Sequence, residues 1–198
     1  MRVLVYDRTQ KALTAAWSAG SVLYRGLRRI DAAKGVASWD EAFAFLREID
    51  GPIDELQYWG HGKWGAALAD QQVLSLASLS RNHAHRESLD ALAAKLVPGA
   101  LVWFRCCETL GARAGIAFAE QLSAHLGARV AGHTYVIGFH QSGLHGVAPG
   151  ARATWDPAEG LAEGTPESPV RAHPSRPWAP HTITCLQGRV PEAWLSYS

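Results

Sequence analysis

The run Ala100–Phe104 constrains the fold of this chain more than any other feature, because consecutive apolar residues mark a strand that is buried on both faces. Such strands lie inside parallel sheets that are covered by helices on both sides. An apolar helical pattern follows, from Gly111 to Leu126, and Gly127 is placed to end that helix. We therefore expect a strand and then a helix, the repeating unit of a parallel α/β protein.

The rest of the chain repeats this order. Strands are predicted at residues 2–6, 53–59 and 129–131, helices at 10–29, 39–49 and 86–96, and a small hairpin at 64–78. Ser38 and Glu41 have the spacing of a capping box, which marks the start of the second helix. Residues 135–139 either continue the strand at 129–131 or form the next one. The predicted fold class is α/β, a three-layer sandwich with a mostly parallel central sheet.

The composition changes after Val147. Seven of the ten prolines lie between residues 147 and 180, with few aliphatic residues, which is typical of a long loop or arm. Strand character returns at 181–186, at a predicted sheet edge. We expect an α/β core at 1–146, a Pro/Gly-rich loop or arm at 147–180, and a C-terminal strand and tail at 181–198 that packs on the core.

The charge and hydropathy exclude several classes of protein. A formal net charge of +1 gives no electrostatic footprint for nucleic acid or an anionic membrane. No apolar stretch is long enough to span a membrane, and the apolar run at the N-terminus is too short for a secretory signal. Three cysteines do not make a disulfide framework in a chain of 198 residues. We predict a cytoplasmic protein, and the excess of Arg over Lys with abundant Ala suggests a bacterial source.

Two residues that can carry chemistry follow two of the predicted strands. His61, between Gly60 and Gly62, follows the strand at 53–59, and Cys106 follows the run Ala100–Phe104. The carboxyl ends of parallel strands meet at one edge of a sheet, so these side chains should lie together. An imidazole can stabilise a thiolate and protonate a leaving amine. The backbone N–H groups of Gly62 and Cys106 can form an oxyanion hole.

This pattern resembles the caspase-like cysteine peptidases, in which a strand ends in His-Gly and another, about 50 residues later, ends in the nucleophilic Cys. The motifs here read Leu56-Gln-Tyr-Trp-Gly-His61-Gly62 and Leu101-Val-Trp-Phe-Arg-Cys106. The likeness is greatest to bacterial caspase-like domains, whose Gly five residues after the Cys matches Gly111, and it covers roughly residues 1–140. The resemblance implies a caspase-like fold and a cysteine endopeptidase with a His61–Cys106 dyad, a peptide or protein substrate and no cofactor.

The adjacent thiol of Cys107 competes for this role. Consecutive side chains point in different directions, so only one of the pair should face His61, and the register with Gly111 favours Cys106. The residue before the presumed nucleophile is Arg105, where a small residue is common in the family.

Four further residues are candidates for substrate binding: Trp64, Arg105, Glu108 and His133. Glu108 favours a basic substrate residue before the cleaved bond, whereas Arg105 favours an acidic one. The sequence does not choose between them. His133 either lines the cleft or lies on the surface, as do His140 and His145.

Other functions stay open. The same fold can serve as a catalytically inactive binding or scaffolding module in a multi-protein or biosynthetic assembly. A metal site could combine His61, Cys106, Cys107 and a later histidine, but the chain has neither Cys-x-x-Cys nor His-Glu-x-x-His spacing, so no metal is predicted. Cys185 lies in a strand pattern and is expected to be structural. A homodimer through a sheet edge is an alternative to a monomer.

Overall fold

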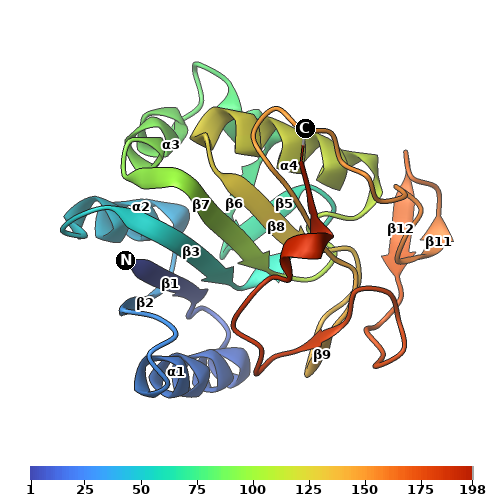
Figure 1. The fold of residues 1–198 in the computed structure, drawn as a ribbon, viewed down its shortest axis with the longest axis horizontal. Coiled ribbons are helices and arrows are strands. Elements are labelled where there is room, and N and C mark those ends of the chain that lie inside the picture. Colours follow the sequence, from blue (N-terminus) through green and yellow to red (C-terminus); the bar gives the residue numbers. More distant parts are fainter. Residues whose placement is uncertain (198) are drawn as a thin grey trace.

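Seven strands form the central sheet of the computed structural model, which describes residues 1–197 (Figure 1). Ser198, the last residue of the predicted tail, lies outside the described residues. In spatial order the strands are β14 (Leu195–Ser196), β10 (Leu144–Val147), β8 (Arg129–His133), β7 (Leu96–Arg105), β3 (Ile53–Trp59), β1 (Arg2–Asp7) and β2 (Ala32–Val36). The strands from β8 to β2 are parallel, whereas β10 and β14 are parallel to each other and run antiparallel to the other five. The predicted α/β class with a mostly parallel sheet is confirmed.

Helices cover the two faces of this sheet. One face carries α1 (Lys11–Gly26), and the other carries α2 (Trp39–Glu48), α3 (Arg86–Ala93) and α4 (Ala112–Leu126) (Figure 1). Successive strand residues point to opposite faces, so Leu4 packs with Tyr24 of α1 while Val3 and Val5 join the larger core beneath α2 and α4. Within the described residues, no helix is both long and apolar enough to cross a membrane.

The helix boundaries follow local sequence signals. Ser38 Oγ accepts a hydrogen bond from the backbone N–H of Glu41 at 3.1 Å, as the capping box predicts. The Glu41 carboxylate completes the cap by accepting from the N–H of Ala37 at 2.8 Å, one residue earlier than a standard box. At the other end of the fold, α4 is followed by Gly127 in the left-handed region, at φ +60°.

Two strands differ from the prediction. The edge strand β2 was not expected, because its sequence Ala-Ala-Lys-Gly-Val has little apolar character. Strand β7 begins at Leu96 and runs through Pro98 and Gly99, which were expected to separate a helix from a strand. Its pairing with β3 is irregular at this point, which accommodates a proline without an N–H to donate.

The chain after β8 also differs. Residues 135–139 form no strand, and β9 (His140–Gln141) pairs instead with β13 (Ile183–Thr184) outside the central sheet. The strand predicted at 181–186 is therefore only two residues long, and the sheet edge is formed by β14. The side of the sheet that α1 leaves open, over β7 and β8, is covered by the C-terminal segment through Ile183.

Two small sheets complete the fold. A hairpin motif of β4 (His61–Gly62), β5 (Ala66–Ala69) and β6 (Gln72–Ser75) follows β3 and leads into a 3₁₀ turn, Leu76–Leu79. In the Pro/Gly-rich arm, β11 (Leu161–Gly164) pairs with β12 (Pro169–Ala172). The arm is held to the core by Trp155, which is buried and donates its Nε1–H to the carbonyl of Leu110 at 3.1 Å. A last 3₁₀ turn, Glu192–Trp194, precedes β14.

Candidate active site

A pocket of about 460 Å³ opens at the carboxyl ends of β3 and β7. Its walls come from α1, which contributes Trp17, and from the loop after β8, which contributes Phe139. Both His61 and Cys107 line it, together with Arg105 at the end of β7. An imidazole and a thiol, which the sequence predicts at this edge of the sheet, therefore line one pocket. The thiol is that of Cys107 and not of Cys106.

Cys106 does not face this pocket. Its side chain is fully buried, its Sγ lies 3.8 Å from the carbonyl of Tyr58, and it belongs to the core cluster that contains Val102 and Phe104. The two-residue period of the strand puts residues 102 and 104 on the core face, and Cys106, in the bend directly after Arg105, joins the same cluster. Cys107, half-buried, points to the opposite face with Arg105. Cys106, the predicted partner of His61, therefore does not line the pocket, whereas Cys107 lines it together with His61.

Burial disfavours the thiolate form of both cysteines. It raises the pKa of Cys106 well above its usual value, and the neighbouring Cys107 adds to that effect. Burial also raises the pKa of Cys107, more weakly. The Cys107 thiol donates to the carbonyl of Ile137 at 3.9 Å. This thiol consequently requires a base before it can act as a nucleophile at neutral pH.

His61 offers a free ring nitrogen at this place. Its ring meets that of Trp17 edge-on, with the ring centroids 5.7 Å apart. In the described part of the chain, the Nε2 atom of His61 is buried and has no hydrogen-bond partner. Buried polar atoms are nearly always satisfied, so an unpaired imidazole nitrogen beside a pocket points to a group that binds there.

The backbone after His61 is set by a tight turn. Lys63 and Ala66 exchange two backbone hydrogen bonds, of 2.9 and 3.0 Å, around Trp64 and Gly65. Both central residues have positive φ, +32° and +82°, as a type I′ turn requires. Because hydrogen-bonded and non-hydrogen-bonded pairs alternate along an antiparallel ladder, Gly62 belongs to a non-hydrogen-bonded pair. Its N–H therefore points away from β5.

Gly62 also packs directly against the turn that carries the two cysteines. A Cβ atom at this position would lie 2.0 Å from Thr109 Oγ1 and 2.7 Å from the Cβ of Cys106. Only glycine leaves room for this approach. The Gly62 backbone is thus held beside the cysteine turn after β7, although Gly62 itself does not line the pocket.

Arg105 places a buried positive charge at the pocket. Its guanidinium donates to Gln141 Oε1 at 2.7 and 3.0 Å, to the Tyr24 hydroxyl at 2.7 Å and to the carbonyl of Cys185 at 3.1 Å, and it lies 4.4 Å from the ring centroid of Trp103. These partners are all neutral. Among the described residues that line the pocket, none is Asp or Glu. Among the described residues, the groups in contact with this charge are therefore dipoles and aromatic rings, and the Glu55 carboxylate acts on it from a longer distance.

The other three predicted binding residues lie outside the pocket. Trp64 packs beneath Lys63, whose Nζ is 4.8 Å from the ring centroid. Glu108 is buried within the turn that follows β7, where burial raises the pKa of its carboxyl. His133 is fully buried and its Nδ1 lies 3.1 Å from the carbonyl of Ser142. Burial, and secondarily the Arg105 charge, lower the pKa of His133 to about 3. The expectation that these three contact a substrate is not met by their positions.

Sequence reasoning missed the walls of the pocket. Trp17, Tyr24, Phe139 and Leu186 come from a helix and two loops far apart in the chain, and aromatic or aliphatic residues carry no chemical signal by themselves. Cys185 lines the pocket as well, where it was expected to be only structural.

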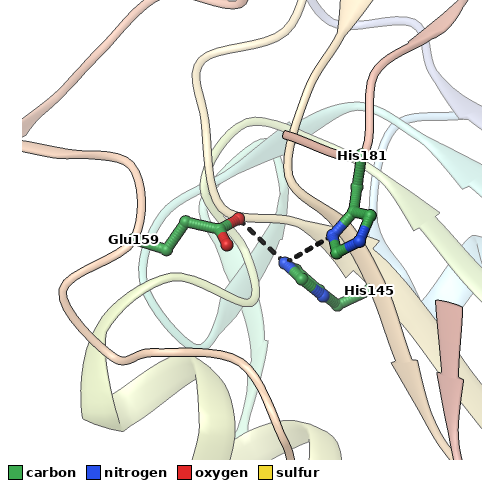
Figure 2. A group of neighbouring side chains, drawn as sticks. All are labelled: His145, Glu159 and His181. Carbon is green, nitrogen blue, oxygen red and sulfur yellow. Dashed lines mark hydrogen bonds and ion pairs between the residues drawn. The ribbon is translucent and has the colours of Figure 1, made fainter. Parts of the chain in front are cut away.

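A second group of side chains lies away from this pocket and was not predicted as a unit. His145, Glu159 and His181 bring three atoms of the kinds that ligate metals within 4.8 Å of one another (Figure 2). None of the three is among the residues that line the pocket.

Comparison of the chain with protein-family models, with curated proteins and with solved structures found no significant match. The interpretation of the pocket therefore depends on its own chemistry and on the sequence motifs.

Proposed function

We propose that the protein is a cysteine endopeptidase of caspase-like fold, with Cys107 as the nucleophile and His61 as the general base and acid. The observation that carries the proposal is that the side chains of Cys107 and His61 line the same open pocket, and that the buried Nε2 of His61 has no hydrogen-bond partner among the described residues. The His-Gly and Cys motifs at the ends of β3 and β7 support it, now with the cysteine shifted by one residue.

In the proposed first step, His61 removes the proton from Cys107 Sγ, and the thiolate attacks the carbonyl carbon of the substrate peptide bond. A C–S bond forms and the carbonyl electron pair moves to oxygen. His61 then gives its proton to the amide nitrogen, the C–N bond breaks, and an acyl-enzyme remains. Water, deprotonated by His61, attacks this thioester, and the Cys107 thiol is regenerated with its proton.

The N–H groups of Gly62 and Cys107 are the proposed donors to the oxyanion. The N–H of Gly62 is free of the β4–β5 ladder, and its backbone packs against the cysteine turn. Donors fixed in the backbone need no reorganisation when charge develops on the substrate oxygen, which is where such donors contribute most.

The pocket favours a substrate with an acidic residue before the cleaved bond. Arg105 supplies the positive charge there, while Glu108, which favoured the opposite preference, does not line the pocket. The rim is apolar and open: the side chains of Phe139 and Leu186 are 58% and 49% exposed. These surfaces suit the apolar side chains of an extended peptide.

A binding or scaffolding module of the same fold is the second candidate. The observation that favours it is that the Cys107 thiol donates to the carbonyl of Ile137 at 3.9 Å, while burial raises the pKa of the same thiol and keeps it protonated. In that function the pocket would hold a peptide without cleaving it.

Digestion of a peptide library separates the two functions. We expect the wild type to cleave after Asp or Glu in preference to Lys or Arg, and Cys107→Ala to lose at least 1000-fold in rate while still binding the peptides. Cys185→Ala is the matched control, since it removes a thiol from the same pocket that has no proposed role in the reaction. Cys106→Ala should keep measurable cleavage.

Two results would overturn this proposal. Cleavage that survives Cys107→Ala but is lost in a folded Cys106→Ala variant would return the nucleophile to the buried thiol. Peptide binding without cleavage by the wild type, unchanged in Cys107→Ala, would establish the binding module instead.

A further inference from the structure

Three side chains from distant parts of the chain converge beyond β10. His145 lies on β10, Glu159 lies in the Pro/Gly-rich arm before β11, and His181 lies just before β13. Figure 2 shows the carboxylate and the second imidazole both directed at the ring nitrogen of His145. His145 Nε2 is 2.8 Å from Glu159 Oε1 and 3.4 Å from His181 Nδ1.

The protons of this group do not satisfy both contacts. If His145 Nε2 carries a proton, it donates to the Glu159 carboxylate and has no lone pair left for His181. If His145 Nε2 is unprotonated, its lone pair faces the lone pairs of the carboxylate. With His145 Nε2 and His181 Nδ1 both unprotonated, three electron-pair donors lie within 4.8 Å of one another, and a cation between them would satisfy all three.

The ligand set selects a class of cation. Two imidazole nitrogens and one carboxylate oxygen form a zinc set that leaves a fourth position open for water. Zinc bonds of 2.0–2.1 Å in a tetrahedron put neighbouring ligand atoms about 3.3 Å apart, which is close to the 3.4 Å between the two ring nitrogens. The 2.8 Å between His145 Nε2 and Glu159 Oε1 must lengthen when the ion binds, and the three atoms lie within 4.8 Å of one another without it. Hard cations such as Mg²⁺ and Ca²⁺ prefer oxygen ligands and fit this set poorly.

The surroundings hold the three side chains in place. The Thr134 hydroxyl donates to Glu159 Oε1 at 2.8 Å, which orients the carboxylate. The ring of Trp155 stacks on His145 with centroids 5.0 Å apart, and Trp194 packs beside His181 at 4.9 Å. Outer partners of this kind fix ligand orientation in metal sites. His145 itself is only 5% exposed.

We infer that His145, Glu159 and His181 bind one Zn²⁺ ion, which fastens the Pro/Gly-rich arm and the C-terminal segment to β10 of the central sheet. The inference is independent of the peptidase proposal, because none of the three residues lines the pocket. No metal was predicted from the sequence, which has neither Cys-x-x-Cys nor His-Glu-x-x-His spacing, and these three residues are 14 and 22 positions apart.

The test is metal binding by the full chain. Zinc-free protein is titrated with Zn²⁺ against a chromophoric chelator, and bound zinc is counted by mass spectrometry of the metal. We expect one equivalent in the wild type and at least 100-fold weaker affinity in His181→Asn and in Glu159→Gln. Asn tolerates the positive φ of +45° at position 181, and Gln keeps the hydrogen bond from Thr134, so both variants should fold.

Two controls locate the ion. His173→Ala removes an exposed imidazole from the same arm and should bind zinc as the wild type does. Cys107→Ser removes one thiol from the pocket and should also leave the zinc affinity unchanged. Cobalt substituted into the wild type should show a tetrahedral spectrum without a thiolate-to-metal band, a readout that needs no variant.

Three outcomes would overturn the inference. They are no stoichiometric zinc in the wild type, zinc affinity unchanged in both His181→Asn and Glu159→Gln, and a thiolate-to-cobalt band that places the ion on the cysteines.

Discussion

His133 connects the stability of the protein to pH in a way that can be measured. The side chain is fully buried at the end of β8, and its Nε2 has no hydrogen-bond partner among the described residues. Burial is the main cause that lowers the pKa of His133 from 6.5 to about 3, and the nearby Arg105 charge adds to it. The native protein therefore keeps this imidazole neutral over a pH range in which the unfolded chain protonates it.

The sign and size of the effect follow from that difference. Above pH 6.5 His133 is neutral in both the native and the unfolded state, so its titration costs no stability. As the pH falls from 6.5 toward 3, only the unfolded state takes up the proton, and the free energy of unfolding decreases. One pKa unit corresponds to about 1.4 kcal/mol, so the whole effect is on the order of 5 kcal/mol. That is a large fraction of the stability of an ordinary domain.

His133→Gln removes the titration and keeps an amide N–H that can donate to the carbonyl of Ser142. Urea unfolding at several values between pH 6.5 and pH 4 should show the variant gaining about 3 kcal/mol relative to the wild type over that range, whatever constant cost the substitution carries. His173→Gln, at an exposed position, is the matched control and should follow the wild type. If the unfolding free energies of His133→Gln and the wild type stay parallel with pH, the reasoning is refuted.

Three further predictions concern the cysteine turn. Iodoacetamide should label Cys107 in the native protein at least 10-fold faster than Cys106. The labelling rate should rise only above the usual thiol pKa, because burial raises the pKa of both cysteines. Fragment-ion spectra locate the label, and equal labelling of the two cysteines would contradict the assignment. Gly62→Ala should lower the free energy of unfolding by about 1–3 kcal/mol, because the added Cβ would lie 2.0 Å from Thr109 Oγ1. Gly138→Ala is the control: a Cβ there meets no atom within 4 Å, so the same denaturation assay should show no change. Above about pH 8.5 the unfolded chain loses the Cys106 proton that the native state retains, so the free energy of unfolding of the wild type should fall as the pH rises. Cys106→Ala should make that slope shallower by about 1.4 kcal/mol per pH unit. A wild-type curve that is flat in this range would disprove the prediction.

The helices and strands that were predicted correctly are those whose own residues carry a clear signal, either an apolar pattern or a cap. The buried run at Ala100–Phe104, the amphipathic pattern of α4 with Gly127, and the cap at Ser38 each specify their element through neighbouring residues. Strand β2 was missed because its five residues carry little apolar character, and it forms by pairing with β1. Pairing energy from a neighbour leaves no mark in the sequence of the strand itself.

The sequence by itself determined that an imidazole and a thiol would meet at the carboxyl edge of a parallel sheet, because strand order and motif position are enough for that. Which thiol lines the pocket with His61 was decided only by the tertiary structure. Alternation puts Cys106 and Cys107 on opposite faces, but the position of α1 decides which face holds the pocket and which is filled by core.

The cluster of His145, Glu159 and His181 depended still more on tertiary structure. Its members are joined by irregular loops, which have no period from which a direction can be predicted. Only the packing of the arm and the C-terminal segment onto β10 brings their ligand atoms to one point.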